Sequence, residues 1–213
     1  MRILITGGTG MVGTALAKSL LAEGHNVWIL TRNPRAALIP EGARAVGWDG
    51  RTSVGWGEMV NQMDAVVNLV GERLSRWPWT KRQKNRFWDS RVDCGHALVE
   101  AIHAAATPPQ VLIQASGVNY YGPRDLDPVS EAQAPGKDFL ADLCKAWEAS
   151  TEPVERMGVR RIIIRSAIVL CPWKAAGIGV RLSLSDCGSS PGQPVDRLIV
   201  LWLLFLVCSL NFF

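Results

Sequence analysis

The stretch TGGTGMVG, residues 6–13, has glycines at positions 7, 10 and 13, three residues apart. A short apolar segment, RILIT (2–6), precedes it, and a segment with apolar side chains along one helical face, residues 11–23, follows it. Apolar periodicity of this kind predicts a buried strand, then a glycine-rich turn, then an α-helix that ends at Gly24. The turn decides how closely a ligand can approach the start of the helix.

A helix N-terminus presents backbone N–H groups that have no partner within the helix, and its dipole favours an anion. In this turn Gly7 would allow a tight bend, Gly10 the close approach of a pyrophosphate, and Gly13 a close contact between helix and strand. Glycine-rich turns also occur without a ligand. Because this one follows a strand and opens a helix at the start of a βαβ pattern, we expect dinucleotide binding.

Strand-like and helix-like segments alternate along the first 170 residues. Further strands are expected at residues 26–31, 44–48, 64–71, 110–116 and 159–170, and further helices at 81–106 and 138–157. The alternation indicates an α/β fold with a Rossmann-like, doubly wound parallel sheet. Ligands of such sheets bind at the carboxyl ends of the strands. The segments of interest are therefore residues 6–13, 31–33, 69–72 and 116–122.

The residues after the second strand indicate which dinucleotide is bound. In NAD-binding sites an acidic residue after this strand holds the ribose 2′-hydroxyl. Here the strand ends in TRNPR (31–35), which contains Arg32 and Arg35 and no acidic residue. A guanidinium binds a 2′-phosphate with two donors, whereas a carboxylate would repel it. The sequence favours NADP over NAD, with the alternative that Arg32 is an ordinary solvated charge at the end of a strand.

The composition is that of a globular protein and argues against several classes of function. Of the 213 residues, 48% are hydrophobic and 20% are charged, and the net charge is +4. This mild charge suits a small anionic ligand, and no nucleic-acid motif is present, so no nucleic-acid partner is expected. Five cysteines and three histidines show no metal-ligand spacing, so no metal site is expected. The N-terminus does not resemble a signal peptide, which favours a cytoplasmic location.

Tryptophan is unusually frequent, with nine residues in the chain. Four of them, Trp56, Trp77, Trp79 and Trp88, fall between residues 50 and 90. We expect their large rings to pack this long connection against the sheet, and therefore to be mostly buried.

Further motifs make the chain resemble a known family. They are, in order, NLVGE (68–72), SRV (90–92), SGVNYYG (116–122) and KDFLADLCKAWEA (137–149). With the glycine-rich stretch and Arg32, they resemble the extended, atypical short-chain dehydrogenase/reductases. The likeness is greatest to the uncharacterised "epimerase family" branch, which is NAD(P)-dependent epimerase/dehydratase-like. It covers about residues 1–170 and implies a Rossmann-like domain that binds NADP(H).

The resemblance also implies roles for individual residues. Those expected to contact the pyrophosphate are Gly7, Gly10, Met11 and Val12. Those expected to line the adenine and ribose side are Leu69, Val70 and Gly71. Arg32 would hold the 2′-phosphate, and Arg91 lies in a helix that faces the cofactor in this family. Ser116 falls where short-chain dehydrogenases keep the serine that polarises a substrate carbonyl.

The chain departs from the superfamily at the catalytic pair. Short-chain dehydrogenases use a Tyr and a Lys four residues apart, and the Lys lowers the pKa of the Tyr so that the phenol can shuttle a proton. Lys145 is in place, but Ala141 stands where the Tyr is expected. The only tyrosines of the chain are Tyr120 and Tyr121, on the loop after the fifth strand. Tyr121 joins Ser116 and Lys145 as a catalytic candidate.

Alternatives remain for these residues. Either tyrosine is a possible proton donor, and both are also compatible with merely shaping the pocket wall. Lys145 fits a contact with a cofactor ribose, or a place on the helix surface. The sequence does not decide between these roles.

The βα pattern stops after Leu170. Residues 171–197 are rich in Gly, Pro and Ser, and residues 198–213 are almost wholly apolar. Family members continue with a second half that supplies most of the substrate pocket. We therefore expect an NADP-binding domain at 1–170 and an aberrant, poorly packed segment at 171–213. A shifted reading frame or early truncation would leave the substrate-binding part missing or replaced.

A membrane anchor at 198–213 is a lesser alternative, because the segment is shorter than the ~20 residues that span a bilayer. The main hypothesis is an NADP(H)-binding oxidoreductase or epimerase-like enzyme for a small carbonyl compound or nucleotide sugar, impaired in this chain. The alternative is a non-catalytic NADP-binding redox sensor, which the missing Tyr favours. The sequence does not identify the substrate, the oligomeric state, or whether reduction or epimerisation occurs.

Overall fold

Six parallel strands form the central sheet of the computed structural model, which describes residues 1–124, 128–167 and 169. The strands are β1 (Arg2–Thr6), β2 (Asn26–Thr31), β3 (Arg44–Gly47), β4 (Ala65–Asn68), β5 (Val111–Gly117) and β6 (Arg160–Ser166). Their order is β3-β2-β1-β4-β5-β6, and all neighbouring pairs are parallel. The order reverses between β1 and β4. In open sheets a crevice forms at such a reversal, at the carboxyl ends of the strands.

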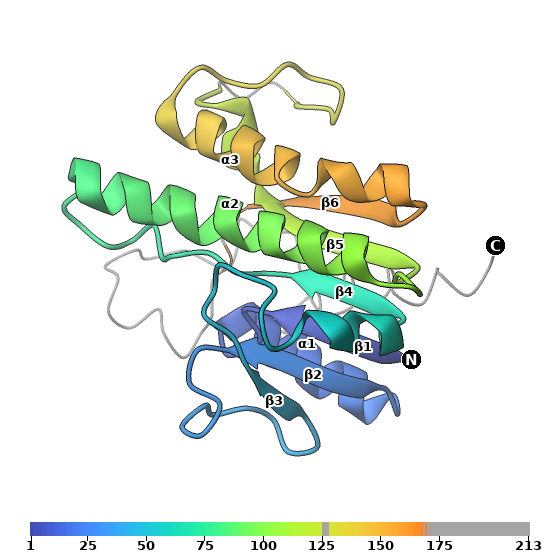
Figure 1. Ribbon diagram of the computed structural model, residues 1–213. Helices are drawn as coiled ribbons and strands as arrows, with labels where there is room; N and C mark the ends of the chain where they lie inside the picture. The colour runs from blue at the N-terminus through green and yellow to red at the C-terminus, as the bar shows by residue number, and fades with distance from the viewer. Residues whose placement is uncertain (125–127, 168, 170–213) are drawn as a thin grey trace, which may run out of the picture.

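Helices lie on both faces of this sheet. The α-helices are α1 (Met11–Ala22), α2 (Lys81–Ala104) and α3 (Phe139–Ala149). The described 3-10 helices are η1 (Gly57–Gln62), η2 (Val118–Tyr121) and η3 (Glu152–Met157). α1 covers one face, and α2 and α3 lie side by side over the other (Figure 1). The three layers confirm the Rossmann-like α/β fold.

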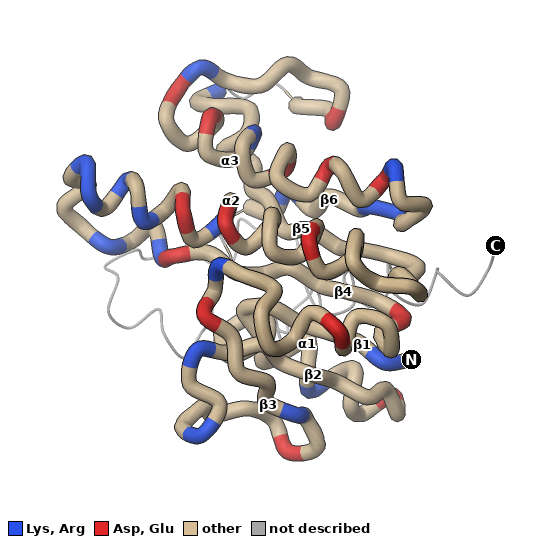
Figure 2. Tube along the Cα trace, viewed as in Figure 1, with Lys and Arg blue, Asp and Glu red and all other residues tan. Residues whose placement is uncertain are grey.

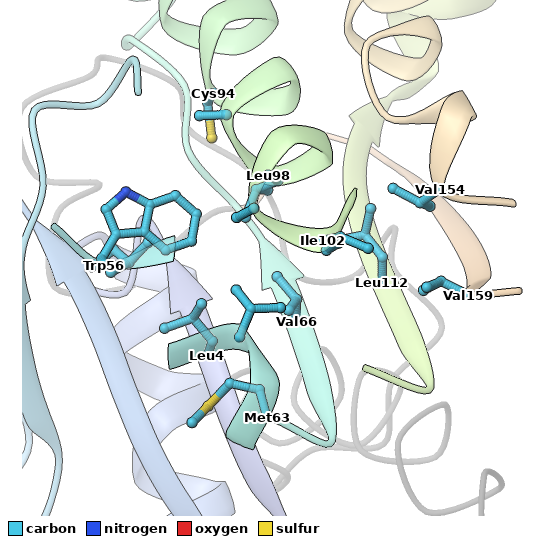
Figure 3. Packing of buried hydrophobic residues seen from close by; sticks show 14 of the residues in the cluster. Leu4, Trp56, Met63, Val66, Cys94, Leu98, Ile102, Leu112, Val154 and Val159 are labelled. Atoms are coloured by element: carbon cyan, nitrogen blue, oxygen red, sulfur yellow. The ribbon is translucent and has the colours of Figure 1, made fainter. Parts of the chain in front are cut away.

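The two faces of the sheet bury separate apolar clusters. Ile5 packs on the α1 side and Leu4 on the α2 side, because successive side chains of a strand point to opposite faces. Figure 3 shows the α2 side, where strand and helix residues interdigitate. The central members there are Leu4, Val66, Leu98, Ile102 and Leu112. Their burial holds α2 across the middle strands and so fixes the position of its N-terminal half.

All the expected strands are present, but the single helix expected over 138–157 is wrong. α3 ends at Ala149, and the 3-10 helix η3 follows it. The Ser150 hydroxyl donates to the Trp147 carbonyl oxygen at 2.6 Å, and so offers that carbonyl an alternative to a helical partner. Pro153 then has no N–H with which to continue an α-helix.

The tryptophans of the long connection divide into buried and exposed residues. Trp56 is 2% exposed and packs edge to face against Trp48, with 5.7 Å between ring centroids. Trp79 is partly buried against the N-terminal part of α2. Trp77 is 83% exposed and Trp88 is 37% exposed, so the expectation of burial is wrong for these two.

The segment 171–213, expected to pack poorly, lies outside the described residues, as does the apolar segment 198–213 within it. The division of the chain at residue 170 therefore stays a prediction. Among the helices that the structure describes, none has the length and apolar character needed to cross a membrane.

Candidate functional site

The glycine-rich turn brings the start of α1 against the ends of β1 and β4. Gly7 has a φ of +70°, and a Cβ atom there would lie 2.8 Å from the backbone carbonyl of Leu69, so no side chain fits. A Cβ atom on Gly13 would lie 2.5 Å from the Gly7 carbonyl oxygen. These contacts match the tight turn and the close helix–strand packing expected for these two glycines.

The N-terminus of α1 has no side-chain cap. Gly10 is the N-cap residue, and no acidic residue occupies the first turn. The Thr14 amide donates to the Gly10 carbonyl at 2.9 Å, so the amides of Met11 and Val12 precede the first bond within the helix. Around a Cβ atom placed on Gly10, the Gly7 carbonyl oxygen is the only atom within 4 Å among the described residues outside the adjoining backbone. Uncapped amides beside open space fit a dinucleotide pyrophosphate.

A cavity of about 610 Å³ opens beside this turn. Residues 30–33 and 48–51, after β2 and β3, form one wall. Residues 70–72, together with side chains from the β4–α2 connection and from α2, form the other. The size and the position at the strand ends suit one half of a dinucleotide.

The residues expected to bind the cofactor divide between the cavity and its surroundings. Those that line it are Gly7, Arg32, Val70 and Gly71. Those at the helix start, outside the lining, are Gly10, Met11 and Val12. Leu69 packs against the core on the α1 side, and its backbone lies next to Gly7.

Sequence reasoning missed part of one wall of the cavity. Residues 48–51 follow β3 directly, and they line the cavity beside residues 31–33. The rule that ligands bind after strands also applies to this strand, so it would have found them. Arg86 of α2 was also missed, because a position in the middle of an amphipathic helix carries no comparable signal.

Cations slightly outnumber anions in the cavity lining, with four arginines against three carboxylates. Glu72 is paired with Arg76 at 2.8 Å. Arg32 and Arg86 have no ion pair within the described residues. Figure 2 shows further Lys and Arg residues along the N-terminal half of α2, which borders this cavity. This charge suits a phosphorylated ligand.

Arg91 of α2 lies behind the β4–α2 turn and is 7% exposed. It donates to the carbonyl oxygens of Phe87 (3.0 Å) and Glu72 (3.3 Å), and its guanidinium lies 4.8 Å from the ring centroid of Trp147. Burial lowers the pKa of Arg91 to about 10, although the charge of Glu72 opposes this shift. A Cβ atom on Gly71 would lie 2.9 Å from the guanidinium carbon. A buried cation therefore lies directly against the turn expected to contact the cofactor.

A row of buried polar side chains joins the strand ends beneath the crevice. Thr6, Asn68 and Gln114 are register partners on β1, β4 and β5. The Thr6 hydroxyl donates to Asn68 at 2.6 Å, and the Asn68 amide donates to Gln114 at 2.8 Å. The Cys94 thiol also donates to Asn68 at 3.2 Å, and burial raises its pKa. This row could not be predicted from the sequence, because its members are far apart along the chain.

Ser116 lies at the end of β5 and is 4% exposed. Its hydroxyl donates to Glu148 Oε1 of α3 at 2.6 Å. Glu148 in turn accepts two bonds of 2.8 Å from Arg165 of β6, one on each carboxylate oxygen. The hydroxyl hydrogen that would polarise a substrate carbonyl is therefore engaged with a carboxylate.

Tyr121, on η2, joins the same network. Arg165 Nη1 donates to the Tyr121 hydroxyl oxygen at 2.8 Å, and the guanidinium carbon lies 3.5 Å from the ring centroid of Tyr120. Tyr121 is 8% exposed and lines a second cavity, of about 760 Å³, together with Arg165. No hydrogen bond donated by the Tyr121 hydroxyl is found within the described residues.

Lys145 lies apart from this network. Its ammonium pairs with Asp142 one helical turn away, at 2.6 Å, and its side chain is 41% exposed. Ala141, at the position expected for a Tyr, is fully buried. The structure thus joins Ser116 and Tyr121 through Glu148 and Arg165, but no described hydrogen bond joins either of them to Lys145. Glu148 and Arg165 were missed from sequence.

The parallel sheet, the uncapped helix after a glycine-rich turn and the arginine-lined cavity define a Rossmann-like protein with a crevice of the dinucleotide-binding type. The sequence profile of the "NAD dependent epimerase/dehydratase family" matches residues 3–142. The chain belongs to this family.

Curated relatives agree with this assignment. The epimerase family protein SDR39U1 of Bos taurus is 34% identical over 174 residues, which cover 80% of this chain and 55% of the relative. The epimerase family protein ML0860 of Mycobacterium leprae is 33% identical over 180 residues, which cover 84% of this chain and 56% of the relative. The chain therefore spans little more than half the length of these relatives.

Solved structures show the same fold. The crystal structure of human epimerase family protein SDR39U1 (isoform 2) with NADPH has a TM-score of 0.64 and 30% identity, over 81% of this chain and 55% of that one. A nucleoside-diphosphate sugar epimerase from Corynebacterium glutamicum has a TM-score of 0.70 and 28% identity. The match covers 95% of this chain and 43% of that epimerase. Family and structures together support a nucleotide cofactor of the NAD(P) type.

Proposed function

We propose that this protein binds NADP(H), with the pyrophosphate at the N-terminus of α1 and the 2′-phosphate at Arg32. The observation that carries the proposal is the uncapped helix start beside Gly10, next to a cavity that Arg32 lines. The human relative whose structure contains NADPH supports the choice of the phosphorylated dinucleotide. Arg91 adds a buried positive charge behind Gly71, which lines the same cavity.

A thermal-shift titration tests this binding. Once the NADPH concentration exceeds its dissociation constant, the melting temperature is expected to rise with the logarithm of that concentration. NADH is expected to raise the melting temperature less. Gly10→Glu should abolish the shift, because a carboxylate would then occupy the open space at the helix start. Lys18→Ala on the exposed side of α1 is the matched control. Equal or stronger stabilisation by NADH would refute the NADP assignment.

For the chemistry, we propose oxidoreductase or epimerase-like action on a small carbonyl compound or a nucleotide sugar. Bound NADP(H) would supply or accept the hydride. Tyr121 would donate its phenolic hydrogen to the substrate oxygen, since Arg165 already occupies the phenolic oxygen as a donor. Glu148 orients Arg165, and Ser116 would contact the substrate only by giving up its bond to Glu148. Lys145 remains a candidate for a cofactor ribose.

NADPH oxidation in the presence of ketones or aldehydes tests the reductase chemistry, and conversion of a nucleotide sugar to its epimer, which leaves NADP(H) unchanged overall, tests the epimerase chemistry. Both assays are run on this chain and, with equivalent substitutions, on the longer Mycobacterium leprae relative. Tyr121→Phe is expected to lower kcat by about 100-fold or more, in the range of general acid–base catalysis, with NADPH affinity unchanged. Tyr120→Phe keeps the aromatic face under Arg165 and serves as the control. Equal effects of the two substitutions would contradict a chemical role for Tyr121.

A second candidate is a non-catalytic NADP-binding redox sensor. The observation that favours it is the buried Ala141 at the Tyr position, together with the engagement of the Ser116 hydrogen by Glu148. A sensor would bind NADPH and NADP⁺ with different affinities, and it would neither oxidise NADPH with a carbonyl compound nor reduce NADP⁺ with an alcohol. Turnover that depends on Tyr121 would eliminate this candidate. The cytoplasmic location and the absence of a nucleic-acid partner stay predictions.

A further inference from the structure

The turn after β3 has a backbone fixed by several hydrogen bonds. Asp49 Oδ1 accepts from the amides of Arg51 (2.8 Å) and Thr52 (2.9 Å), and Asp49 Oδ2 accepts from the Thr52 hydroxyl at 2.8 Å. The indole N–H groups of Trp48 and Trp56 both donate to the Thr52 carbonyl oxygen, at 2.9 and 2.8 Å. Both indoles are more than nine-tenths buried. The position from which the Arg51 side chain extends is therefore well defined.

This turn lies against the arginine expected to hold the 2′-phosphate. A Cβ atom on Gly50 would lie 3.9 Å from Arg32 Cδ, so the turn backbone packs beside the Arg32 stem. Both Arg32 and Arg51 line the same cavity, from the ends of two neighbouring strands. Two arginine residues from adjacent loops thus line one space.

Neither guanidinium has a strong competing partner. Arg32 has no ion pair within the described part of the chain. Arg51 has one, to Asp93 at 3.6 Å, between side chains that are 69% and 37% exposed, and exposed pairs of this kind contribute little. The nearest carboxylate in sequence, Asp49, already accepts three hydrogen bonds within its own turn. A phosphate dianion would therefore meet two available cations.

We propose that Arg51 is a second phosphate-binding residue and that Arg32 and Arg51 together set the preference for the 2′-phosphorylated dinucleotide. This inference rests on the proposed function, because it deepens the account of the same site. A dianion accepts hydrogen bonds from two guanidinium groups at once, and each such charge-assisted bond is stronger than a neutral one. An unphosphorylated ribose offers hydroxyl groups but no anionic group for the second arginine.

Isothermal titration of the full chain with NADPH and with NADH tests the proposal. The measured quantity is the ratio of the two dissociation constants. Arg51→Gln is expected to lower the preference for NADPH by about tenfold while NADH affinity stays within about twofold, since only the phosphate contact is lost. Arg51→Lys should retain part of the preference, because an ammonium binds phosphate as a point charge. Circular dichroism and the melting temperature check that each variant folds.

Two arginine substitutions act as controls. Arg86→Gln removes a charge from the opposite wall of the same cavity, and Arg73→Gln removes an exposed charge outside its lining. Arg73→Gln is expected to leave both dissociation constants within about twofold. Arg86→Gln is expected to weaken the binding of both dinucleotides, because the cavity loses a positive charge, while the ratio changes by less than about twofold. If Arg86→Gln lowers the ratio as much as Arg51→Gln, the overall charge of the cavity explains the preference and the proposal is wrong.

The remaining outcomes separate this inference from the proposed function. If the unmodified chain binds neither dinucleotide, or does not prefer NADPH, the proposed function fails and this inference fails with it. If the chain prefers NADPH and Arg32→Gln reduces that preference but Arg51→Gln does not, only the role of Arg51 is refuted. An equal loss of NADPH and NADH affinity in Arg51→Gln also refutes it, because the 2′-phosphate would then not be the group contacted.

Discussion

Arg91 is the residue whose environment is hardest to explain by stability alone. Its guanidinium is buried, and its described hydrogen bonds are to carbonyl oxygens, with no carboxylate among the acceptors. For a base, a pKa lowered by burial means that folding disfavours the charged form. Burial lowers the pKa of Arg91 to about 10, so its charge costs stability at every pH below that value. An anion bound at the adjacent Gly71 turn would offset this cost.

We predict that Arg91→Met lowers NADPH affinity by about tenfold and changes the melting temperature of the free protein by less than about 4 °C. The apolar side chain keeps the packing against Trp147 and removes a desolvated charge, and such replacements are often neutral or stabilising. Titration calorimetry and thermal melts measure the two effects. A large loss of stability with unchanged NADPH affinity would show that Arg91 is purely structural.

At the scale of elements, the contact between α1 and β1 depends on a missing side chain. We predict that Gly13→Ala destabilises the protein by about 2–4 kcal/mol, because its Cβ would lie 2.5 Å from the Gly7 carbonyl oxygen and 2.6 Å from the Gly8 Cα. Urea unfolding measures the change. Lys18→Ala, on the exposed side of the same helix, should stay within about 0.5 kcal/mol. If Gly13→Ala leaves the free energy of unfolding unchanged, the close approach of α1 to the turn after β1 is not required for stability.

The N-terminal half of α2 borders the cavity and begins with a capped turn. The Thr80 hydroxyl accepts from the Gln83 amide at 3.2 Å. We predict that Thr80→Ala lowers the free energy of unfolding by about 1 kcal/mol, the usual contribution of an N-cap, whereas Thr80→Ser restores most of it. Chemical denaturation of the three proteins gives the comparison. If serine fails to restore stability, the threonine methyl group rather than the cap is responsible.

At the scale of the whole molecule, the polar row beneath the crevice connects three strands. We predict that Asn68→Ala destabilises the protein by about 2–4 kcal/mol, because Thr6, Gln114 and Cys94 each lose a buried partner. Denaturant unfolding tests this, with the exposed Asn85→Ala of α2 as the control. A loss no larger than that of the control would mean that the three remaining groups satisfy one another.

The layered fold was predictable because its signals are local. Apolar strands, helical periodicity and the glycine turn each occupy a few consecutive residues, and the observed elements follow them. Prediction failed where side-chain contacts compete with the pattern, as where Ser150 and Pro153 end α3 early. It also failed for Trp77, because residue type alone does not say that its connection leaves the ring in solvent.

The candidate site was predictable only in its backbone part. Gly7 and Arg32 follow strands and line the cavity as expected. The partners of Ser116 and Tyr121 were not predictable, because Glu148 and Arg165 come from a helix and an edge strand that meet only in the folded sheet. A single sequence records no such long-range pairs.

The central claim is that the amides at the start of α1 bind the pyrophosphate of NADPH while Arg32 binds its 2′-phosphate. A crystal structure of this chain grown with NADPH tests it most directly. The account predicts density for the pyrophosphate within hydrogen-bonding distance of the Met11 and Val12 amides, and for the 2′-phosphate beside Arg32. A crevice closed by side chains, or NADPH bound elsewhere on the molecule, would contradict it.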